Sequence, residues 1–509
     1  MQSLPTINPF NLQHEINAIL AVRYINVMIK KTNAVKTRFT LMLFLFFLGF
    51  GLTAQDKVWS LEECIRYAIE NNIQIQQNEI NQEISKQDLT SSRYGLLPDL
   101  NGFASHGYNF GQAIDPFTNE FATTQVRTNS VSLSSSVVLF NGFNNINSIK
   151  RNQSNLEAAR YDLEKIKNDI SLNIANQYLR ILFNKELLKN AENQLKVTQV
   201  QKNRVSKQVS AGSLPEGALK DIEAQYASEE LQLINAENEL KLAKLTLAQL
   251  LRLESADGFK IESPPLDNFK SVSTLVSPSS LYATAVDIMP EVKSAQYNYY
   301  SAEKNRSIAR SGYTPTLTFS GSFGSGYSGN NREVTGFTSP VRVQTGSFVE
   351  GSNTPVYTFS SNPIFQDKSF FDQLDDNFNT SVSFRLNIPI FNGLNARTNV
   401  QRAKLQVQSA NLALENTKLE LRQNIESAYV DAVAALKRYR AAEKSVDALE
   451  TSFNYTQQRF DVGLVNSFDY SNEKNRLNNA QSELLQAKYN YIFSTKVLDF
   501  YQGKAFTLD

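Results

Sequence analysis

The chain has 509 residues, a formal net charge of +1 and 20% charged residues, a balance that offers no basic field for nucleic acid and no acidic surface for cations. Its 14 prolines and 21 glycines are too few to separate many compact domains, so we expect long uninterrupted elements. One cysteine and two histidines nearly exclude His-based catalytic triads and multi-His or multi-Cys metal sites. We therefore expect no enzyme activity, no catalytic residue, no metal site and no cofactor, although counting alone does not exclude carboxylate chemistry.

The N-terminal region has the pattern of a secretory signal. An apolar run at 41–52 follows Lys30, Lys31, Lys36 and Arg38, and the small residues after it predict cleavage near Ala54. The run is too short for a membrane anchor, because a helix needs about 20 residues to cross a bilayer. The stretch 1–27 is unusual ahead of a signal, and Met28 is an alternative start.

Two isolated residues with reactive side chains have structural interpretations. Cys64 lies too far past the apolar run for lipidation, and a single thiol forms no disulfide within the chain. We expect Cys64 to be a small buried residue of the first helix. His106 lies in a predicted strand, where we expect no chemistry from it.

The chain contains an internal repeat, which is the first feature to look for in a long sequence. Two Asn-Gly pairs align at an offset of 251, and two later glycines align at the same offset without a gap. The pairs are Asn141-Gly142 and Asn392-Gly393, and the glycines are Gly212 and Gly463. The chain is therefore predicted to contain two structural repeats.

Upstream of the Asn-Gly pairs the two copies align differently. Pro98 matches Pro315 at an offset of 217, so the second copy must carry an insertion before its Asn-Gly pair. The stretch at about 325–377 is rich in Gly, Ser, Thr and Asn, which predicts a long loop there. The corresponding loop of the first copy, near 109–127, is much shorter.

Long helices are expected after each Asn-Gly pair, where no proline occurs before the aligned glycines. Leu405, Leu412 and Leu419 repeat every seven residues, interleaved with Leu414 and Leu421. This pattern is typical of helices packed in coiled-coil fashion. Each helix would reach roughly 100 Å at 1.5 Å per residue, and the chain would reverse at the aligned glycines into an antiparallel partner helix.

Immediately before each Asn-Gly pair the apolar period changes from seven to two. Apolar residues alternate with Ser at 131–139 and with Asn, Ser and Arg at 378–390, as in strands with one apolar and one hydrophilic face. A second strand is expected after Pro98 and after Pro315, which gives one β-hairpin per repeat. A soluble hairpin on a helical core would also alternate, but the strand length, the Ser-rich face and the predicted secretion favour membrane strands.

Four strands per chain are too few to close a barrel, since roughly eight enclose a filled interior. An open sheet edge is not tolerated in lipid. Several chains must therefore share one barrel, and three copies would give twelve strands.

Three features resemble the TolC family of outer-membrane efflux and secretion ducts. The opening WSLEECIRYAIENNIQI at 59–75 is similar to that family's first helix, and FDVGLVNSFDYSNEKNRLNNAQSELLQAKYNYIF at 460–493 is similar to its last turn and return helix. The third feature is the set of strand-helix junctions, marked by Pro98, Asn141, Gly142, Pro315, Asn392 and Gly393. Their order, duplication and spacing extend over nearly all of the mature sequence.

The resemblance implies a fold class that is mainly α with a transmembrane β part. Two repeats would contribute long antiparallel coiled-coil helices to a periplasmic α-barrel and four strands per protomer to a shared 12-stranded β-barrel in a homotrimer. It also implies an exit duct for efflux or type I secretion in contact with outer-membrane lipid. A periplasmic adaptor (membrane fusion) protein would open this duct, and an inner-membrane RND or ABC-type pump would power it.

The expected segments follow from the offsets and the resemblance. They are 1–54 (N-terminal extension and signal), 55–98 (first helices), 99–140 (β-hairpin), 141–251 (long helical hairpin), 252–277 (equatorial connector), 278–315 (first helices of repeat 2), 316–391 (β-hairpin with a long extracellular loop), 392–501 (long helical hairpin) and 502–509 (tail).

The resemblance further implies an acidic pore constriction at the periplasmic tip. The family's first aspartate after the last turn matches Asp469, and its second matches the neutral Asn472. The 251 offset relates these positions to Ala218 and Asp221, and Glu216 lies close by. We expect Asp469, with Asp221 or Glu216, to form a cation-favouring ring; the alternative is a group of solvated surface acids.

The two tip turns have two possible roles, adaptor contact and simple helix capping. The residues expected there are Gly212, Gly463, Leu464 and Val465. The family's latch arginine matches Val465, so a latch would need Arg459 or Arg476 instead.

A periplasmic coiled-coil structural or adaptor protein without a pore is the main alternative function. Heptads, duplication and secretion suit it, but it does not account for two hairpins with matched apolar faces. An enzyme would need a carboxylate pair in a cleft, and tubular helices offer no obvious one.

Overall fold

The computed structural model describes three stretches of the chain, residues 58–122, 125–264 and 276–504. The predicted signal segment, its cleavage site near Ala54 and the alternative start Met28 lie outside the described residues. The described chain forms two units. In the small unit, β1 (Val58–Trp59) pairs in parallel with β6 (Lys260–Ile261); all other elements belong to the large unit.

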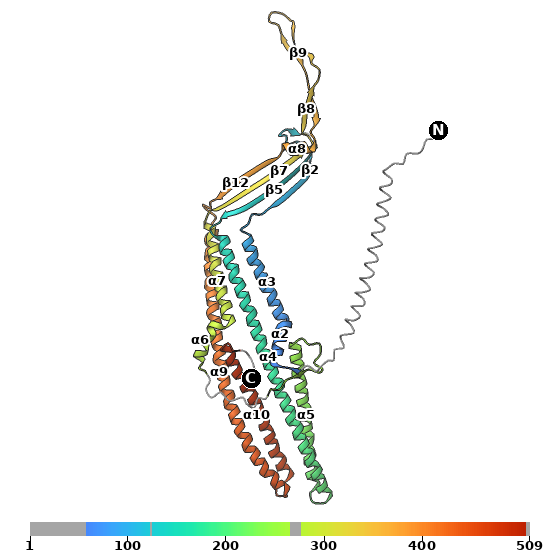
Figure 1. Cartoon of the computed structure of the whole chain (residues 1–509), viewed down its shortest axis with the longest axis vertical. Coiled ribbons are helices and arrows are strands. Elements are labelled where there is room, and N and C mark those ends of the chain that lie inside the picture. Colours follow the sequence, from blue (N-terminus) through green and yellow to red (C-terminus); the bar gives the residue numbers. More distant parts are fainter. Residues whose placement is uncertain (1–57, 123–124, 265–275, 505–509) are drawn as a thin grey trace, which may run out of the picture. The chain divides into compact units, whose positions relative to one another are not determined.

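The large unit contains a four-stranded antiparallel sheet in the order β12-β7-β5-β2 (Figure 1). Its strands are β2 (Asn101–Asn109), β5 (Val126–Phe140), β7 (Thr316–Ser328) and β12 (Asn379–Asn387). β2 and β5 form the hairpin of the first repeat, and β7 and β12 form that of the second. The two hairpins join through β5 and β7, which confirms the prediction of one hairpin per repeat.

One face of this sheet is apolar and the other carries serines. Val137, Phe319 and Phe384 are neighbours across three strands, and the rings of Phe319 and Phe384 lie 4.9 Å apart. Because successive side chains of a strand point to opposite faces, the alternate serines line the other side. Two cross-strand pairs there share hydrogen bonds of 2.9 and 2.8 Å, Ser320 with Ser383 and Ser322 with Ser381.

The sheet continues into long helices through the same backbone geometry in both repeats. The φ angles of Gly142 and Phe143 are 65° and 63°, and those of Gly393 and Leu394 are 61° and 63°. A Cβ at Gly142 would lie 1.8 Å from Thr314 Oγ1, so both the space and the positive φ require glycine there. The repeat is thus preserved at the level of backbone conformation.

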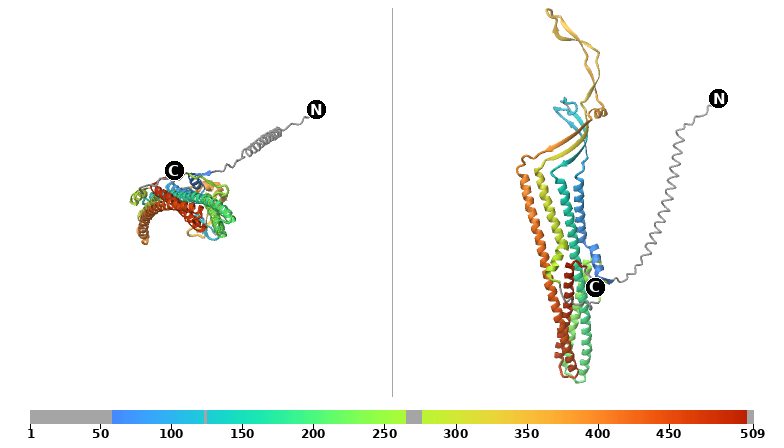
Figure 2. Two further views of the ribbon diagram at one scale, coloured as in Figure 1. Left: turned by 90° about the horizontal axis from the view of Figure 1, so that it is seen from below. Right: turned by 60° about the vertical axis from the view of Figure 1, so that its left-hand side comes forward.

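Four helices pack side by side in the order α3, α4, α7 and α9 (Figure 2). They span Ile73–Tyr94, Asn144–Ser210, Pro290–Arg310 and Asn395–Asp461. α3 precedes β2, α4 follows β5, α7 precedes β7 through the 3₁₀ turn η2 (Ser311–Tyr313), and α9 follows β12. The helices therefore repeat the order of the strands, with α3 and α9 at the ends of the row.

Two further helices return antiparallel to the longest ones. α5 (Glu216–Leu250) packs on α4, and α10 (Ser467–Tyr501) packs on α9 and also contacts α4 and α5. α4 and α9 both have 67 residues, and α5 and α10 both have 35. The bounds of α4 and α9, and of α5 and α10, differ by the predicted 251, whereas α2 (Leu61–Asn71) and α6 (Pro278–Ile288) differ by 217. The two structural repeats are confirmed.

The core of the large unit lies between helices. One cluster joins Leu281 and Met289 to Leu421 of α9 and Leu498 of α10. Cys64 is fully buried in α2 and His106 lies in β2, both as predicted. Among the described residues, no helix combines the length and the apolar character needed to cross a membrane.

The long helices pack as predicted, but only part of the leucine heptad packs within the chain. Leu414 and Leu421 are buried, whereas Leu405, Leu412 and Leu419 are 64 to 66% exposed. A seven-residue period predicts an apolar stripe on a helix, but it does not predict which neighbouring helix packs against that stripe. α9 therefore carries one stripe for its own chain and a second one that faces outward.

The prediction of a long loop at 325–377 was wrong. This stretch extends β7 and then forms two antiparallel strand pairs, β8 with β11 and β9 with β10, followed by a short helix. The elements are β8 (Arg332–Phe337), β9 (Val341–Phe348), β10 (Pro355–Ser360), β11 (Pro363–Asp367) and α8 (Phe370–Asp376). The Gly, Ser and Asn residues lie mainly at the turns, while Val, Phe, Tyr and Thr, which favour strands, fill the segments between them. The shorter loop of the first repeat holds the two-residue pair β3 (Ala113–Ile114) and β4 (Phe121–Ala122).

Candidate functional site at the paired helical turns

α4 reverses into α5, and α9 reverses into α10, through turns of the same form. The glycine after each long helix has a positive φ, 72° at Gly212 and 78° at Gly463. Each glycine amide donates to the carbonyl three residues earlier, and the next amide donates to the carbonyl five residues earlier, as in the Schellman motif. A Cβ would meet nothing within 4 Å at either glycine, so the positive φ rather than space requires glycine.

The second turn exposes apolar side chains that the first turn lacks. Val462, Leu464 and Phe468 are 71%, 71% and 68% exposed, while Val465 is half-buried. At the positions related by the 251 offset the first turn carries Ala211, Ser213 and Gly217. The two turns therefore share a backbone but present different surfaces.

The residues predicted for the constriction lie in the first two turns of α5 and α10. Asp469 is exposed, and its backbone amide donates to the Oδ1 of the N-cap Asn466 at 2.8 Å. Asn472 and Glu216 are also exposed. Asp221 is held differently, because its carboxylate accepts a 2.8 Å hydrogen bond from Ser467 Oγ across the two hairpins.

An ion pair that the sequence did not indicate joins the two long helices near their ends. Arg204 of α4 places Nη1 2.5 Å from Asp461 Oδ1 of α9. Arg476, a candidate for a latch, instead pairs with Glu473 of its own helix at 2.7 Å. The 251 offset gives Arg204 no charged counterpart, so neither repeat symmetry nor spacing could have pointed to it.

Lys474 of α10 forms a buried ion pair with Glu229 of α5. Its Nζ lies 2.9 Å from Glu229 Oε1, and both side chains are at most 5% exposed. Nζ also donates to Thr198 Oγ1 of α4, and the same hydroxyl donates to Glu229 Oε2 at 2.5 Å. Because a buried charge is tolerated only when it is paired and hydrogen-bonded, this group holds three helices in one register.

The hydrogen bonds of this buried group continue into two amides. Gln225 Nε2 donates to Glu229 Oε1 at 2.8 Å, and Gln225 and Asn475 exchange hydrogen bonds of 2.7 and 3.1 Å. The pKa of Lys474 is below its ordinary value of 10.5, because burial lowers it by more than the hydrogen bond and the charge of Glu229 raise it. Loss of either partner would leave the other charge buried alone.

Aromatic stacking fixes the start of α10 on the end of α9. The ring of Tyr470 stacks on Phe460 with centroids 4.7 Å apart and also contacts Phe453 at 5.4 Å. Burial, with the nearby charge of Asp461, raises the pKa of Tyr470 to about 12. Tyr470 is therefore neutral at physiological pH and acts as a packing residue.

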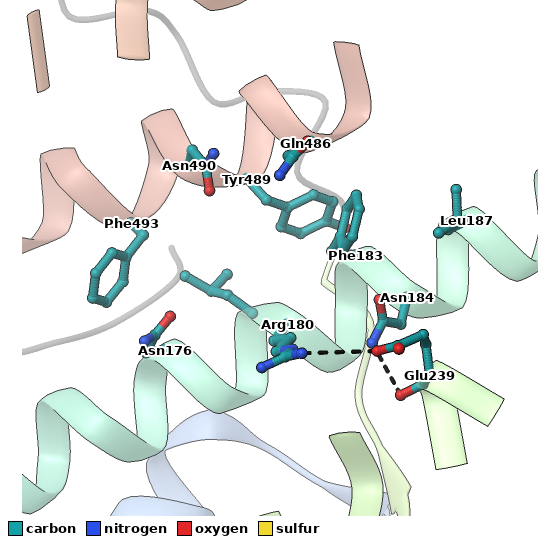
Figure 3. A pocket seen from close by; sticks show the side chains of 11 residues that line it. Asn176, Arg180, Phe183, Asn184, Leu187, Glu239, Gln486, Tyr489, Asn490 and Phe493 are labelled. Carbon is teal, nitrogen blue, oxygen red and sulfur yellow. Dashed lines mark hydrogen bonds and ion pairs between the residues drawn. The ribbon is translucent and has the colours of Figure 1, made fainter. Parts of the chain in front are cut away.

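Farther along α10, residues of α10, α4 and α5 line a cavity of about 410 Å³ (Figure 3). Tyr489 lies against Phe183 with ring centroids 6.2 Å apart, and its hydroxyl donates to Glu186 at 2.9 Å. Amides supply much of the remaining lining, from Asn176, Asn184, Gln486 and Asn490. The contact between α10 and the first helical hairpin is thus less tightly filled here than at Lys474.

The residues at these turns form ion pairs and hydrogen bonds between helices and leave other charged and apolar groups exposed. Within the described stretches, no group of three or more His, Cys, Asp or Glu is placed to hold a metal ion. Arg204, Ser467 and Lys474 each join one helical hairpin to the other. The turns beyond them carry exposed carboxylates and an apolar surface.

Comparisons with known proteins match most of the chain. The family model described as "Outer membrane efflux protein" matches residues 64–251 and 281–503. The outer membrane protein TolC of Vibrio cholerae is 22% identical over 446 residues, which cover 87% of this chain and 90% of that protein. TolC of Escherichia coli is 20% identical over 461 residues, with 87% and 82% covered.

Among solved structures, the outer membrane protein VceC of Vibrio cholerae superimposes with a TM-score of 0.67 at 17% identity and covers 87% of this chain and 94% of its own. At that identity the likeness establishes the fold. The family match extends over most of the sequence. The chain therefore belongs to the outer membrane efflux protein family, as a TolC-like channel protein of the outer membrane that extends into the periplasm.

Proposed function

We propose that three copies of this chain form one exit duct for efflux or type I secretion, which a periplasmic adaptor opens and an inner-membrane RND or ABC-type pump drives. The observation that carries the proposal is the pair of open sheet edges. Within the described residues, β2 pairs with β5 alone and β12 pairs with β7 alone. Unpaired backbone groups at such edges are not tolerated in lipid.

The two open edges suit each other. In an antiparallel sheet of four strands the two outer strands run in opposite directions, so β12 of one copy can pair antiparallel with β2 of the next. Three copies would supply twelve strands and leave no edge. The apolar face that contains Phe319 and Phe384 would then contact lipid, and the serine face would line an aqueous lumen.

The two ends of the helix row support the same assembly. Leu405, Leu412 and Leu419 form an exposed stripe on α9, and Ile73, Ile80 and Ile84 form one on α3. The stripes also agree in height: Leu405 lies ten residues below the first residue of α9, and Ile84 lies ten residues below the last residue of α3. Both ends adjoin the sheet, so pairing β12 with β2 would bring these stripes together and bury them.

The tip turns would supply the gate and the adaptor contact. The exposed apolar residues Val462, Leu464 and Phe468 support docking of an adaptor at the second turn, because contiguous exposed apolar surface marks interaction sites. The exposed carboxylate of Asp469 supports an acidic ring at the constriction. Val465 stands at the position of the family's latch arginine. The ion pair of Arg204 with Asp461 would restrain the tip in its place.

A charge placed in the α9 stripe tests the assembly. We expect Leu412→Glu to abolish the SDS-resistant trimer in outer-membrane extracts, because three carboxylates would be buried between copies. Gln406→Glu, an exposed position of α9 outside the stripe, is the matched control and should leave the trimer intact. A Leu412→Glu protein that still runs as a full-strength trimer would contradict the proposed contact.

A further inference from the structure

The long insertion of the second repeat forms a two-stranded ribbon beyond the four-stranded sheet (Figure 1). We define the ribbon as residues 332–367, in which β8 and β9 lead outward and β11 and β10 return. The backbone amide of Lys368 donates to Asn331 O at 3.0 Å and closes the base of the ribbon. The ribbon therefore continues the β7–β12 hairpin, whose outer strand is an open edge of the sheet.

Buried polar contacts hold the ribbon at its base. Ser328 is fully buried, its amide donates to Gln373 Oε1 at 2.9 Å, and its hydroxyl donates to Asp115 of the first-repeat loop. Gln373 Nε2 in turn donates to the carbonyl of Lys368 at 2.9 Å. The base is thus fixed to both repeats, which limits the directions in which the ribbon can point.

The ribbon carries an exposed aromatic stripe. Tyr357 and Phe359 of β10 and Phe365 of β11 are 45%, 73% and 57% exposed. Phe337 and Val334, which pair with Pro363 and Phe365 across the ribbon, are 66% and 49% exposed. Alternate residues of a strand share one face, as Tyr357 and Phe359 do in β10. Directly paired residues of neighbouring strands also share a face, as Phe365 does with Val334, and a bulge in β8 separates Val334 from Phe337. We call these exposed side chains together the stripe.

An isolated ribbon of this kind is not stable in water. Two-stranded hairpins are marginal by themselves and need a third strand or a packed apolar face. In the described part of the chain, each ribbon strand pairs with one other strand only. The ribbon thus has open strand edges and an exposed stripe, and we expect another surface to bind to both.

The charges of the ribbon do not suit a lipid surface. Its charged residues are Arg332, Glu333, Arg342, Glu350 and Asp367. Arg332 pairs with Asp367 at 3.0 Å, and the Arg342 guanidinium lies 4.2 Å from the Tyr357 ring centroid. Binding to anionic headgroups would need a cluster of unpaired basic residues. The near-neutral stripe instead suits a surface of the same composition, such as a second copy of the ribbon.

We infer that the ribbons of neighbouring copies pack against one another along this stripe and form an outer extension of the duct. The inference rests on the proposed trimer, which would bring three ribbons to one end of a shared barrel. Held there, they meet at an effective concentration in the millimolar range, as tethered groups do, so even a weak contact is populated. The occupant of each stripe is the next copy's ribbon.

Cysteine cross-linking in intact cells tests this inference. In a Cys64→Ser background, Phe359→Cys places a thiol in the stripe, and Thr358→Cys places one on the opposite face as the matched control. We expect a short bis-maleimide to join Phe359→Cys chains to one another. We also expect a polyethylene glycol maleimide to label this thiol roughly tenfold more slowly than the control thiol. This ratio holds if only the open state is labelled and the packed state is populated about ten times more than the open one.

A variant without the ribbon separates this inference from the proposed assembly. In this variant a two-residue turn replaces residues 332–367 and joins Asn331 to Lys368. We expect its SDS-resistant trimer to persist, because the four-stranded sheet is unchanged. A stable trimer in which Phe359→Cys and Thr358→Cys label equally fast and do not cross-link would overturn the ribbon contact alone. Slow labelling without cross-linking would also overturn it, in favour of a lipid or another protein as the occupant. A chain that stays monomeric in every variant would overturn both proposals.

Discussion

The Nζ of Lys474 lies 2.9 Å from Oε1 of Glu229, and both side chains are buried between α10 and α5. This relationship ties the second helical hairpin to the first at a level between the turns and the cavity at Tyr489. It also means that α10 cannot slide along α5 without separating two charges inside the protein.

Removal of one partner of this pair should be much more harmful than removal of both. We expect Glu229→Leu to destabilise the protein by roughly 3–5 kcal/mol, because it leaves a buried ammonium unpaired. The double variant Glu229→Leu with Lys474→Met should recover most of that loss. Thermal unfolding of the detergent-solubilised protein measures both, and a double variant no more stable than Glu229→Leu would argue against the pair as the cause.

The ion pair of Arg204 with Asp461 should restrain the tip. Both side chains are partly exposed, so the pair is worth only about 0.2–1 kcal/mol. Arg204→Ala should therefore raise the open population by at most roughly fivefold, seen as higher mean conductance in planar bilayers. Arg476→Ala is the control, since Arg476 pairs within its own helix; equal effects from the two variants would refute the restraint.

Asp469 should control ion selectivity more than Asp221 does. The Asp469 carboxylate is exposed at the turn, whereas that of Asp221 accepts a hydrogen bond from Ser467. We expect Asp469→Ala to reduce the cation preference clearly and Asp221→Ala to change it less. Reversal potentials in a salt gradient report the preference. An unaltered reversal potential in Asp469→Ala would remove this residue from the constriction.

Glu291 of α7 should make stability depend on pH. Burial raises its pKa above the ordinary 4.5, an effect that Asp169 increases and Lys165 reduces. Because the folded-state pKa is the higher one, the folded protein binds the proton first, and stability is lost as pH rises through that value. Near neutral pH the Glu291→Gln variant should therefore have a higher melting temperature than the wild type. The difference between the two melting temperatures should shrink as pH falls toward about 4.5. A constant gap at all pH values would contradict this assignment.

Much of the fold could be predicted because it is periodic. The offsets of 251 and 217 reappear in the helix bounds, and the alternation before Asn141 and Asn392 marks strands that the structure confirms. The conserved backbone at Gly142 and Gly393 explains why those pairs were informative, since a positive φ leaves a glycine signature in the sequence.

Other features could not be read from the sequence. Strands β8 to β11 were hidden because Gly, Ser and Asn at their turns outweighed the short runs of Val, Phe and Tyr between them. The partners Arg204 with Asp461 and Lys474 with Glu229 lie more than 240 residues apart. Such pairs depend on the rotation of each helix about its axis, which the apolar period sets only approximately. The roles of Asp469, Asn472, Gly463 and Leu464 stay predictions.

The mass of the detergent-solubilised complex shows whether several copies of the chain share one barrel. Light scattering corrected for bound detergent gives the number of copies per particle, independently of any variant. We expect three copies, so that every β2 edge pairs with a β12 edge and no sheet edge is left open in the membrane. A stable, conducting particle that contains a single copy would contradict it.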